Sequence, residues 1–312
     1  MGKGNQTLVT EFILLGFSDL PHLQFLLSLT VFLFFLISVL GNVIFLMLVC
    51  VDSHLQKPMY FFLSNLSFLD ICNTSITLST VLDSLFTGNN CVAFPFCITQ
   101  TYCFLSLVST EFFLLTAMAY DRYVAICAPL HYAFIMNKRI CILLAIISWI
   151  LGFLDIIPQT VLISQFFFCE TNEINHFFCD YTALMKLSCS DPQTIEIVIF
   201  TEGVVVGLIP FVLTLTSYIY IISTILKIQS VEGRHKAFST CSSHLTVVIL
   251  FYGTILCVYV RPSSMYSPGQ DKLFSLLYTA LIPMLNPIIY SLRNQDVKNA
   301  LRKIMFRKNY RR

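Results

Sequence analysis

Residues 118–123, MAYDRY, place an acid directly beside a base at the point where a long apolar run ends. An Asp-Arg pair deep in hydrocarbon would cost a great deal of free energy, whereas a pair at the end of a membrane-spanning helix can be held or released at modest cost. We therefore interpret Asp121 and Arg122 as part of a switch at the membrane boundary and not as an anchor.

The composition of the whole chain agrees with a membrane setting. Its 312 residues are 56% hydrophobic and only 12% charged, with a mean hydropathy of +0.78, and a water-soluble fold would need more charge to cover so much apolar surface. We predict an all-α integral membrane protein with one domain, residues 1–312, because no linker, low-complexity segment or internal repeat is visible. Seven runs are long enough to cross about 30 Å of hydrocarbon as helices: residues 25–51, 59–82, 94–120, 140–163, 196–226, 237–260 and 273–292.

The basic residues predict the orientation of this seven-helix bundle, because basic segments stay on the cytoplasmic side of a membrane. With the N-terminus outside, all but four of the 19 Lys and Arg residues fall on the cytoplasmic side, and the exceptions are Lys3, Lys186, Arg261 and Lys272. We therefore expect an extracellular N-terminus (1–24), a helix bundle (25–292) and a cytoplasmic tail (293–312). This is the topology of a multi-pass membrane protein, and we expect it in the plasma membrane.

The tail predicts a short amphipathic surface helix. Val297 and Leu301 lie on one face of it, and Arg302 and Lys303 lie on the opposite face. Such a helix lies in the membrane interface and is attracted to anionic lipid. The lipid bilayer is therefore an expected partner of the tail as well as of the bundle.

Two further features belong to the outer side in this topology. Asn5-Gln6-Thr7 is a glycosylation sequon in the N-terminal segment. Cys97 lies at the outer start of the third run, and Cys169, Cys179 and Cys189 lie in a long outer loop, where oxidising conditions favour disulfides. Four cysteines allow three pairings, which the residues alone do not rank.

Acids within the predicted spans are functional candidates, because a central Asp costs about 2.5–3.5 kcal/mol on insertion scales. The four are Asp70, Glu111, Asp155 and Glu202. Asp70 and Glu111 have no Lys or Arg at comparable depth. Either they share a cation such as Na⁺, or a proton, with Asn42 and Asn286 as polar partners, or they form a hydrogen-bonded structural cluster with one carboxyl protonated. Asp155 is more often a partner for loop or backbone donors, and we assign it no role.

Proline residues within the spans predict bends. Each proline removes a backbone donor and interrupts the helical hydrogen-bond ladder. The prolines concerned are Pro158, Pro210, Pro283 and Pro287. Bent helices allow their ends to swing, which a switch requires.

A family resemblance rests on several motifs together. The chain contains MAYDRYVAIC (118–127), KAFSTCSSHL (236–245), PMLNPIIYSLRN (283–294) and PMYFFL (58–63). With Gly41-Asn42 and Ser217-Tyr218, these motifs resemble the signature of vertebrate odorant receptors, a branch of the rhodopsin-like G-protein-coupled receptors. The similarity covers essentially the whole chain, and the first two motifs together are highly specific.

The resemblance implies a signalling mechanism. Arg122 would be tethered to Asp121 at rest. On activation it would turn toward Tyr218 and Tyr290 as the sixth helix moves outward and opens a crevice for the C-terminus of a Gα subunit. The same switch would include Tyr123, Asn286 and Pro287. The implied partner is a heterotrimeric stimulatory G protein that raises cAMP, and a trafficking chaperone is a further candidate partner.

The resemblance also implies how the outer cysteines pair. Cys97–Cys179 would join the third helix to the outer loop, and Cys169–Cys189 would be an additional bridge within that loop. Tyr252 matches the position at which related receptors keep an aromatic toggle.

A stripe of side chains on the third run indicates a ligand site in the outer half of the bundle. Its members follow helical spacing and share one face: Phe104, Leu105, Val108, Ser109 and Phe112. Such a stripe is more often core packing, and the resemblance turns the balance toward ligand contact. Further lining is expected from Glu202 and Val206 of the fifth helix, Tyr252, Ile255, Leu256 and Tyr259 of the sixth, and Leu276 and Thr279 of the seventh.

A mostly apolar pocket with a few polar points suits a small volatile molecule. Glu202 leaves two alternatives open. An ionised Glu202 facing the cavity would favour an amine, whereas a protonated Glu202, or one turned toward the fourth helix, would only donate a hydrogen bond or pack.

Other functional classes fit less well. A transporter is disfavoured because no repeat is visible, and a membrane enzyme because the chain has no His-Glu-x-x-His, Gly-x-Ser-x-Gly or Gly-rich phosphate loop. We interpret Cys241 and His244, spaced i, i+3, as packing and signalling residues and not as metal ligands. Apart from Na⁺ we expect no cofactor, no metal and no nucleic-acid partner. A rhodopsin-like receptor for a non-odorant metabolite remains an alternative.

Overall fold

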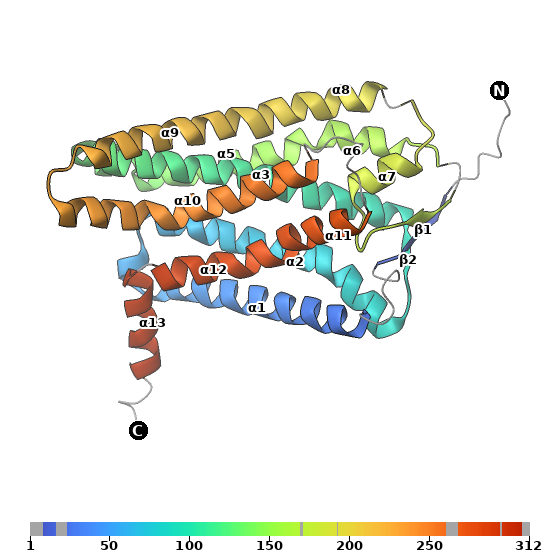
Figure 1. Cartoon of the computed structure of the whole chain (residues 1–312), viewed down its shortest axis with the longest axis horizontal. Helices are drawn as coiled ribbons and strands as arrows, with labels where there is room; N and C mark the ends of the chain where they lie inside the picture. Colours follow the sequence, from blue (N-terminus) through green and yellow to red (C-terminus); the bar gives the residue numbers. More distant parts are fainter. Residues whose placement is uncertain are drawn as a thin grey trace.

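A computed structural model describes residues 9–16, 24–168, 171–191, 193–259, 268–293 and 295–307. Long helices run side by side through the molecule, as Figure 1 shows. The first three are α1 (Gln24–Val51), α2 (Pro58–Thr87) and α3 (Phe94–Cys127). We call each of the seven long helices, or series of helical segments that continue one another, a row. The fourth row is α5 (Lys138–Asp155) followed by α6 (Ile157–Ser164). The fifth row is α8 (Gln193–Glu202) followed by η3 (Gly203–Leu208) and α9 (Ile209–Leu226). The last two are α10 (Val231–Tyr259), and α11 (Pro268–Leu276) followed by η5 (Leu277–Leu281) and α12 (Ile282–Arg293).

Each of the seven predicted runs coincides with one of these rows, which confirms the seven-helix bundle. Five rows are long and apolar enough to cross a membrane by length and composition alone. The other two are α2, which carries many polar side chains inside the bundle, and α10, whose apolar part is the shorter stretch Cys241–Leu256. In the apolar window of α3, 72% of the residues are buried, against 17% for the row from α8 to α9. Helix α3 is therefore the central helix, and the fifth row lies at the edge.

Three rows change their helical geometry next to a proline that the sequence singled out. The fourth row turns at Ile156, two residues before Pro158. The fifth and seventh rows contain the π-helical segments η3 and η5, each of which ends two residues before a proline, Pro210 and Pro283. A proline cannot donate a backbone hydrogen bond, so the preceding turn must adjust its hydrogen-bond pattern. Pro287 differs, because it lies inside α12.

A small three-stranded sheet closes one end of the bundle. Strand β1 (Glu11–Leu14) pairs antiparallel with β2 (Cys91–Ala93) and parallel with β3 (Glu173–Ile174). We call this the sheet end (Figure 1). The prediction of an all-helical chain did not include these strands, which are short and lie outside the apolar runs.

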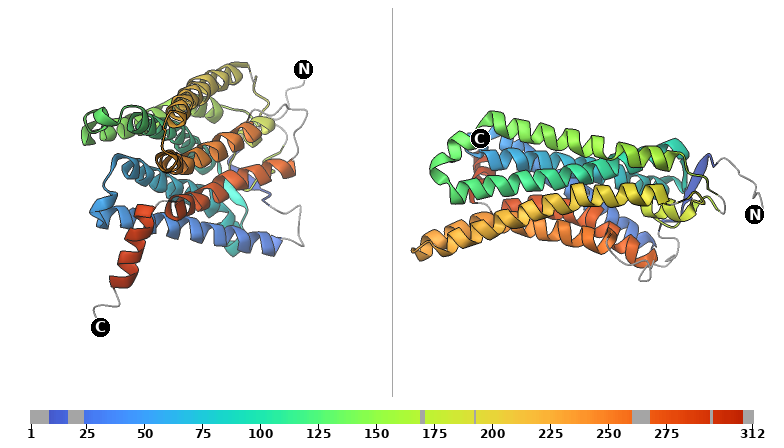
Figure 2. Two further views of the ribbon diagram at one scale, coloured as in Figure 1. Left: turned by 60° about the vertical axis from the view of Figure 1, so that its left-hand side comes forward. Right: turned by 90° about the horizontal axis from the view of Figure 1, so that it is seen from above.

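Short elements connect the rows. Segment η1 (Ser53–Leu55) follows α1, and η2 (Pro129–His131) and α4 (Tyr132–Ile135) join α3 to α5, while α7 (Tyr181–Leu187) lies between β3 and α8. At the end opposite the sheet, α13 (Gln295–Arg307) leaves the bundle at a steep angle, which Figure 1 and the left-hand view of Figure 2 show. We call this the α13 end.

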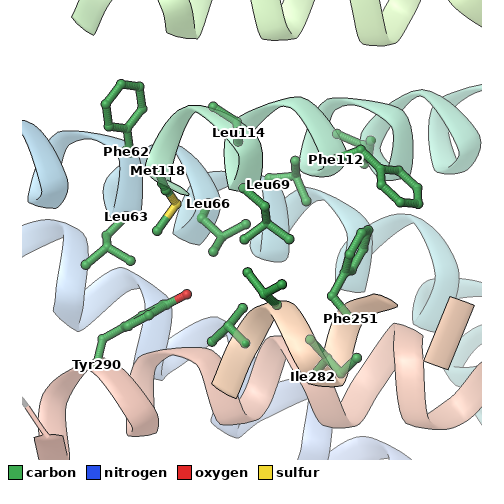
Figure 3. Close-up of a cluster of buried hydrophobic side chains, with 14 of the residues drawn as sticks. Phe62, Leu63, Leu66, Leu69, Phe112, Leu114, Met118, Phe251, Ile282 and Tyr290 are labelled. Atoms are coloured by element: carbon green, nitrogen blue, oxygen red, sulfur yellow. The ribbon is translucent and has the colours of Figure 1, made fainter. Parts of the chain in front are cut away.

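Apolar side chains from α2, α3, α10 and α12 meet in the main core. Figure 3 shows Leu66 and Leu69 of α2 opposite Leu114 and Met118 of α3, all fully buried. Because lipid tails are as apolar as these side chains, close packing between the helices stabilises this core. The large exposed apolar residues instead lie on the outer faces of the rows, such as Met47 at 62% and Leu213 at 53% exposure, as expected for helices that face lipid.

Candidate functional site

A cavity of about 610 Å³ lies between α3, the junction of α5 and α6, the row from α8 to α9, and α10. Nine residues of the predicted site line it: Leu105, Val108, Ser109, Phe112, Glu202, Val206, Tyr252, Ile255 and Leu256. The structure therefore brings most of the predicted positions on the third, fifth and sixth helices together around one space. Whether a ligand occupies that space remains a prediction.

Three predicted positions do not line this cavity. Phe104 is turned about 100° from Leu105 on α3, and its ring packs against Phe178 and Tyr278 at centroid distances of 4.9 and 5.5 Å. Thr279 is fully buried, and its hydroxyl donates to the Ser275 carbonyl. Leu276 packs against the main core. The side chain of Tyr259 lies outside the described part of the structure.

Several lining residues were not predicted, and they are Asp155, Ile156, Gln159, Tyr181, Ile199, Phe200, Gly203, Val204, Gly207, Leu208 and Phe211. Asp155 carried a usable signal, because an acid within an apolar run is rarely without a role. Gln159 follows it by four residues across the helix junction. Tyr181 belongs to the loop helix α7, whose position no periodic pattern could indicate.

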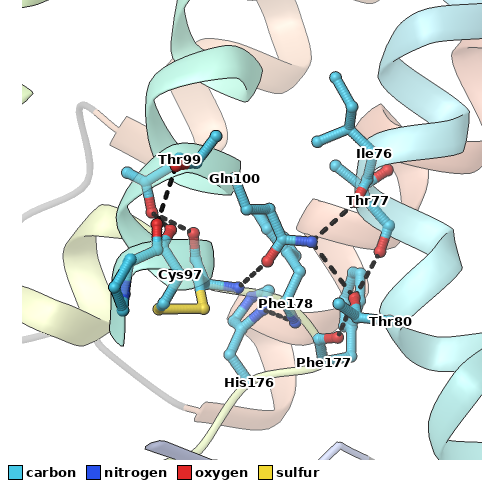
Figure 4. Close-up of a disulfide and its surroundings, with 12 residues drawn as sticks. Ile76, Thr77, Thr80, Cys97, Thr99, Gln100, His176, Phe177 and Phe178 are labelled. Carbon is cyan, nitrogen blue, oxygen red and sulfur yellow. Dashed lines mark hydrogen bonds between the residues drawn. A yellow bond between two sulfur atoms is a disulfide. The ribbon is translucent and has the colours of Figure 1, made fainter. Parts of the chain in front are cut away.

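At the sheet end a disulfide and several hydrogen bonds hold the outer loop, as Figure 4 shows. The structure contains the Cys97–Cys179 disulfide. Beside it, the backbone N–H of Cys179 donates to Gln100 Oε1 at 2.9 Å, and Gln100 Nε2 donates to the Ile76 carbonyl at 2.7 Å. The Thr101 hydroxyl also donates to the Cys179 carbonyl at 2.8 Å. The loop is thereby fixed to both α2 and α3.

Two outer-side predictions fall partly or wholly outside the described residues. Cys189 is disulfide-bonded, but Cys169 is not among the described residues, so the Cys169–Cys189 pairing stays a prediction. Asn5, the predicted glycosylation site, also lies outside them.

The Asp121–Arg122 pair lies near the α13 end of α3, and the ion pair between the two side chains is formed. Arg122 Nε donates to Asp121 Oδ2 at 2.9 Å, and the guanidinium makes a second hydrogen bond to the same oxygen. Tyr132 of α4 donates its hydroxyl to Asp121 Oδ1 at 2.8 Å. Asp121 is fully buried and Arg122 is 9% exposed. Burial, together with the charge of Asp121, raises the pKa of Tyr132, so this phenol remains a donor at neutral pH.

The three remaining tyrosines of the predicted switch make separate contacts. Tyr218 of α9 makes a hydrogen bond with Nδ1 of His244 on α10 at 2.5 Å. Tyr290 is buried in the main core, with its ring 6.3 Å from that of Phe45. Within the described residues the Tyr290 hydroxyl has no hydrogen-bond partner. Tyr123 is partly buried and stacks on Tyr120. The sequence did not predict the contact between Tyr218 and His244.

The two central acids lie close to each other in the core. Asp70 and Glu111 are 1% and 2% exposed and interact electrostatically. Asn286 Nδ2 donates to Asp70 Oδ2 at 2.9 Å, as expected for a polar partner. Asn42 instead donates to the backbone carbonyls of Ser38 and Pro283. Among the described residues, no group of three or more His, Cys, Asp or Glu side chains could hold a metal ion.

Helix α13 is amphipathic and is tied to the loop after α1. Val297 is fully buried, whereas Arg302 and Lys303 are exposed. Lys57 Nζ lies 2.7 Å from Asp296 Oδ2, and this hydrogen bond lowers the pKa of Asp296. The predicted surface helix is therefore present, with its lipid contact still a prediction.

Comparison with known proteins gives a consistent result. Residues 31–308 match the family model described as olfactory receptor. The chain is 50% identical to human olfactory receptor 2AP1 over 301 residues, which is 96% of this chain and 97% of the relative. It is 47% identical to rat olfactory receptor 1f45 over 98% of this chain and 97% of the relative. Human olfactory receptor 6C3 is 46% identical over 96% and 97% of the two chains.

These matches cover almost the full length of the chain and of its relatives, and they agree with the seven-helix bundle. They also exclude the enzyme alternative, since the family consists of signalling receptors. The chain belongs to the olfactory receptor family of G-protein-coupled receptors and is a multi-pass protein of the plasma membrane.

Proposed function

We propose that this receptor binds a small, mostly apolar volatile molecule in the cavity between α3, α6, η3 and α10. The observation that carries the proposal is the lining itself, in which a few polar side chains interrupt an apolar wall. Binding sites for small molecules have this composition, with burial supplying affinity and single polar groups fixing orientation. After immobilisation costs, such a ligand binds in about the micromolar range or more weakly.

The proposed orientation puts the sheet end outside the cell and the α13 end in the cytoplasm. The bias of Lys and Arg toward the α13 end supports it. A ligand in the cavity then lies on the outer side of the bundle, while the Asp121–Arg122 pair faces the G protein. Tyr252 lines the cavity on α10, and His244 lies about two turns away on the same helix. Helix α10 therefore connects the ligand site to the contact with Tyr218.

In the proposed mechanism the described structure is the resting state. A ligand that binds a rearranged cavity more tightly moves α10, breaks the contact between Tyr218 and His244, and releases Arg122 from Asp121. The free guanidinium then turns toward Tyr218, and the opened end accepts the C-terminus of a stimulatory Gα subunit, which raises cAMP. A ligand can shift the equilibrium only by its difference in affinity for the two states.

The test is a cAMP measurement in cells that express the receptor and are exposed to a diverse panel of volatile molecules. A trafficking chaperone is co-expressed, and surface staining of an N-terminal epitope confirms delivery to the membrane. We expect activation by a subset of the panel and no activation of Arg122→Ala at equal surface level. A response that survives in Arg122→Ala would contradict the proposed relay.

A further inference from the structure

Two acids reach the ligand cavity from different helices. Asp155 is the last residue of α5 and Glu202 is the last residue of α8, and both line the cavity and interact electrostatically. One carboxylate oxygen of each, Asp155 Oδ2 and Glu202 Oε1, is buried and has no hydrogen-bond partner among the described residues. No Lys or Arg is among the residues that line the cavity. The cavity therefore contains two acidic side chains that accept hydrogen bonds, and no basic side chain lines it to balance them.

Two hydroxyl groups also line the cavity. Ser109 is 3% exposed and lies within hydrogen-bonding reach of Asp155, whereas Tyr252 is 6% exposed and lies near Thr116 and Thr214. The groups that lack a donor are therefore the two buried carboxylate oxygens, Asp155 Oδ2 and Glu202 Oε1, and a buried acceptor without a partner is costly.

Aromatic rings line the same cavity as Asp155 and Glu202. Phe112, Tyr181, Phe200, Phe211 and Tyr252 all line the cavity. The Tyr252 ring lies 5.2 Å from that of Phe112 and 5.1 Å from that of Phe211. Aromatic faces attract cations. The wall therefore suits an apolar ligand that carries a positive charge.

From these observations we propose that the ligands are small aliphatic amines, bound in the protonated form with the ammonium group between Asp155 and Glu202. This inference rests on the proposed function and names the ligand class of the same site. A cation between the two acids removes their mutual repulsion, and its N–H groups supply the donors that the buried oxygens of Asp155 and Glu202 lack. A neutral alcohol of the same shape has one donor and leaves at least one carboxylate without a partner.

The first measurement needs no variant. Surface-expressed receptor is exposed to hexylamine and cyclohexylmethylamine, and separately to hexanol and cyclohexylmethanol, which keep the carbon skeletons and lack the charge. We expect the amines to activate cAMP production at concentrations at least about tenfold lower than the alcohols, since a buried pair of opposite charges is worth more than a neutral hydrogen bond. Equal or greater potency of the alcohols would overturn the amine inference and leave the receptor function intact.

The second measurement uses Asp155→Asn and Glu202→Gln, which remove charge and keep shape. Each should raise the half-maximal amine concentration at least about tenfold, while the alcohols keep their potency. Glu196→Gln is the matched control, because Glu196 lies on α8, is exposed and does not line the cavity. Unchanged amine potency in the double variant would also overturn the inference. If the wild-type receptor reaches the cell surface and no volatile molecule raises cAMP, the proposed function itself is overturned.

Discussion

The hydroxyl of Tyr218 and Nδ1 of His244 lie 2.5 Å apart, so a buried hydrogen bond joins α9 to α10. Arg122 interacts electrostatically with both residues. In the proposed mechanism, the contact between Tyr218 and His244 therefore joins the two helices that separate, and it lies near Arg122, the residue that is released. A movement of α10 away from α9 would break this hydrogen bond.

His244→Phe should raise cAMP production in the absence of ligand. The variant keeps a ring in the core and removes the hydrogen bond, whose net contribution is about 0.5–1.5 kcal/mol. If the bond stabilises only the resting state, the equilibrium constant for activation rises by about two- to tenfold. Basal cAMP at matched surface expression measures the effect. In a Tyr218→Phe background, where the bond is already absent, His244→Phe should give no further increase.

The Asp70–Glu111 pair leads to a prediction about sodium. Asn286 occupies one oxygen of Asp70, whereas Glu111 Oε1 is buried without a hydrogen-bond partner among the described residues. If Na⁺ is shared between the two acids in the resting state, raising its concentration should lower agonist potency in the wild type. Asp70→Asn should abolish that dependence.

The measurement is the agonist concentration for half-maximal cAMP, with choline replacing Na⁺ at constant ionic strength. Glu196→Gln, which removes an exposed acid, should keep the wild-type dependence. A response that is independent of Na⁺ in both wild type and Asp70→Asn would favour a hydrogen-bonded structural cluster with a shared proton.

Docking of α13 should depend only weakly on the contact between Lys57 and Asp296. Both side chains are about half exposed, and a screened surface pair contributes about 0–1 kcal/mol. Because Lys57 lowers the pKa of Asp296 in the folded protein, this contribution is present above the unfolded pKa and disappears as the pH falls through the folded pKa, which lies below the ordinary value of 3.8.

Thermal unfolding of purified receptor in detergent measures this contribution. Asp296→Asn should lower stability by less than about 1 kcal/mol at neutral pH, and the difference from wild type should vanish in strong acid. A difference that instead grew as the pH fell would contradict the stated sign.

The sequence predicted the helices and nine of the residues that line the cavity for identifiable physical reasons. Seven apolar runs must cross the bilayer as helices, and the spacing along α3 determines which face Leu105, Val108 and Phe112 share. Phe104 shows the limit of that reasoning. A face of a helix is wide, and only the positions of the neighbouring helices decide that Phe104 meets Phe178 and not the cavity.

Contacts between distant segments could not be predicted in the same way. Tyr181 comes from a loop helix. The hydrogen bond between Tyr218 and His244 depends on the relative position of α9 and α10 along their axes, which the sequence does not specify. Asp155 was different, because its place in an apolar run was visible. Assigning it to loop or backbone donors overlooked a cavity that forms at the break before Pro158.

Helix α5 approaches α3 closely because Gly152 has no side chain. A Cβ atom at this position would lie 2.7 Å from the backbone nitrogen of Thr110 and 2.8 Å from its Cα. These are backbone atoms of the central helix, so neither can move without moving α3. Small residues allow such close approaches between membrane helices. We expect Gly152→Ala to destabilise the receptor by about 1–3 kcal/mol through overpacking.

Gly253→Ala is the matched control, because a Cβ atom there meets no other atom within 4 Å. Alanine is also the better helix former, so this variant should be neutral or more stable by about 0.5–1 kcal/mol. Both variants are compared by surface expression and by thermal unfolding in detergent. Loss of expression in Gly152→Ala alone would support rigid packing of α5 on α3. Equal behaviour of the two variants would mean that α5 can shift outward toward lipid at little cost, and the Ser109–Asp155 side of the cavity would then widen with it.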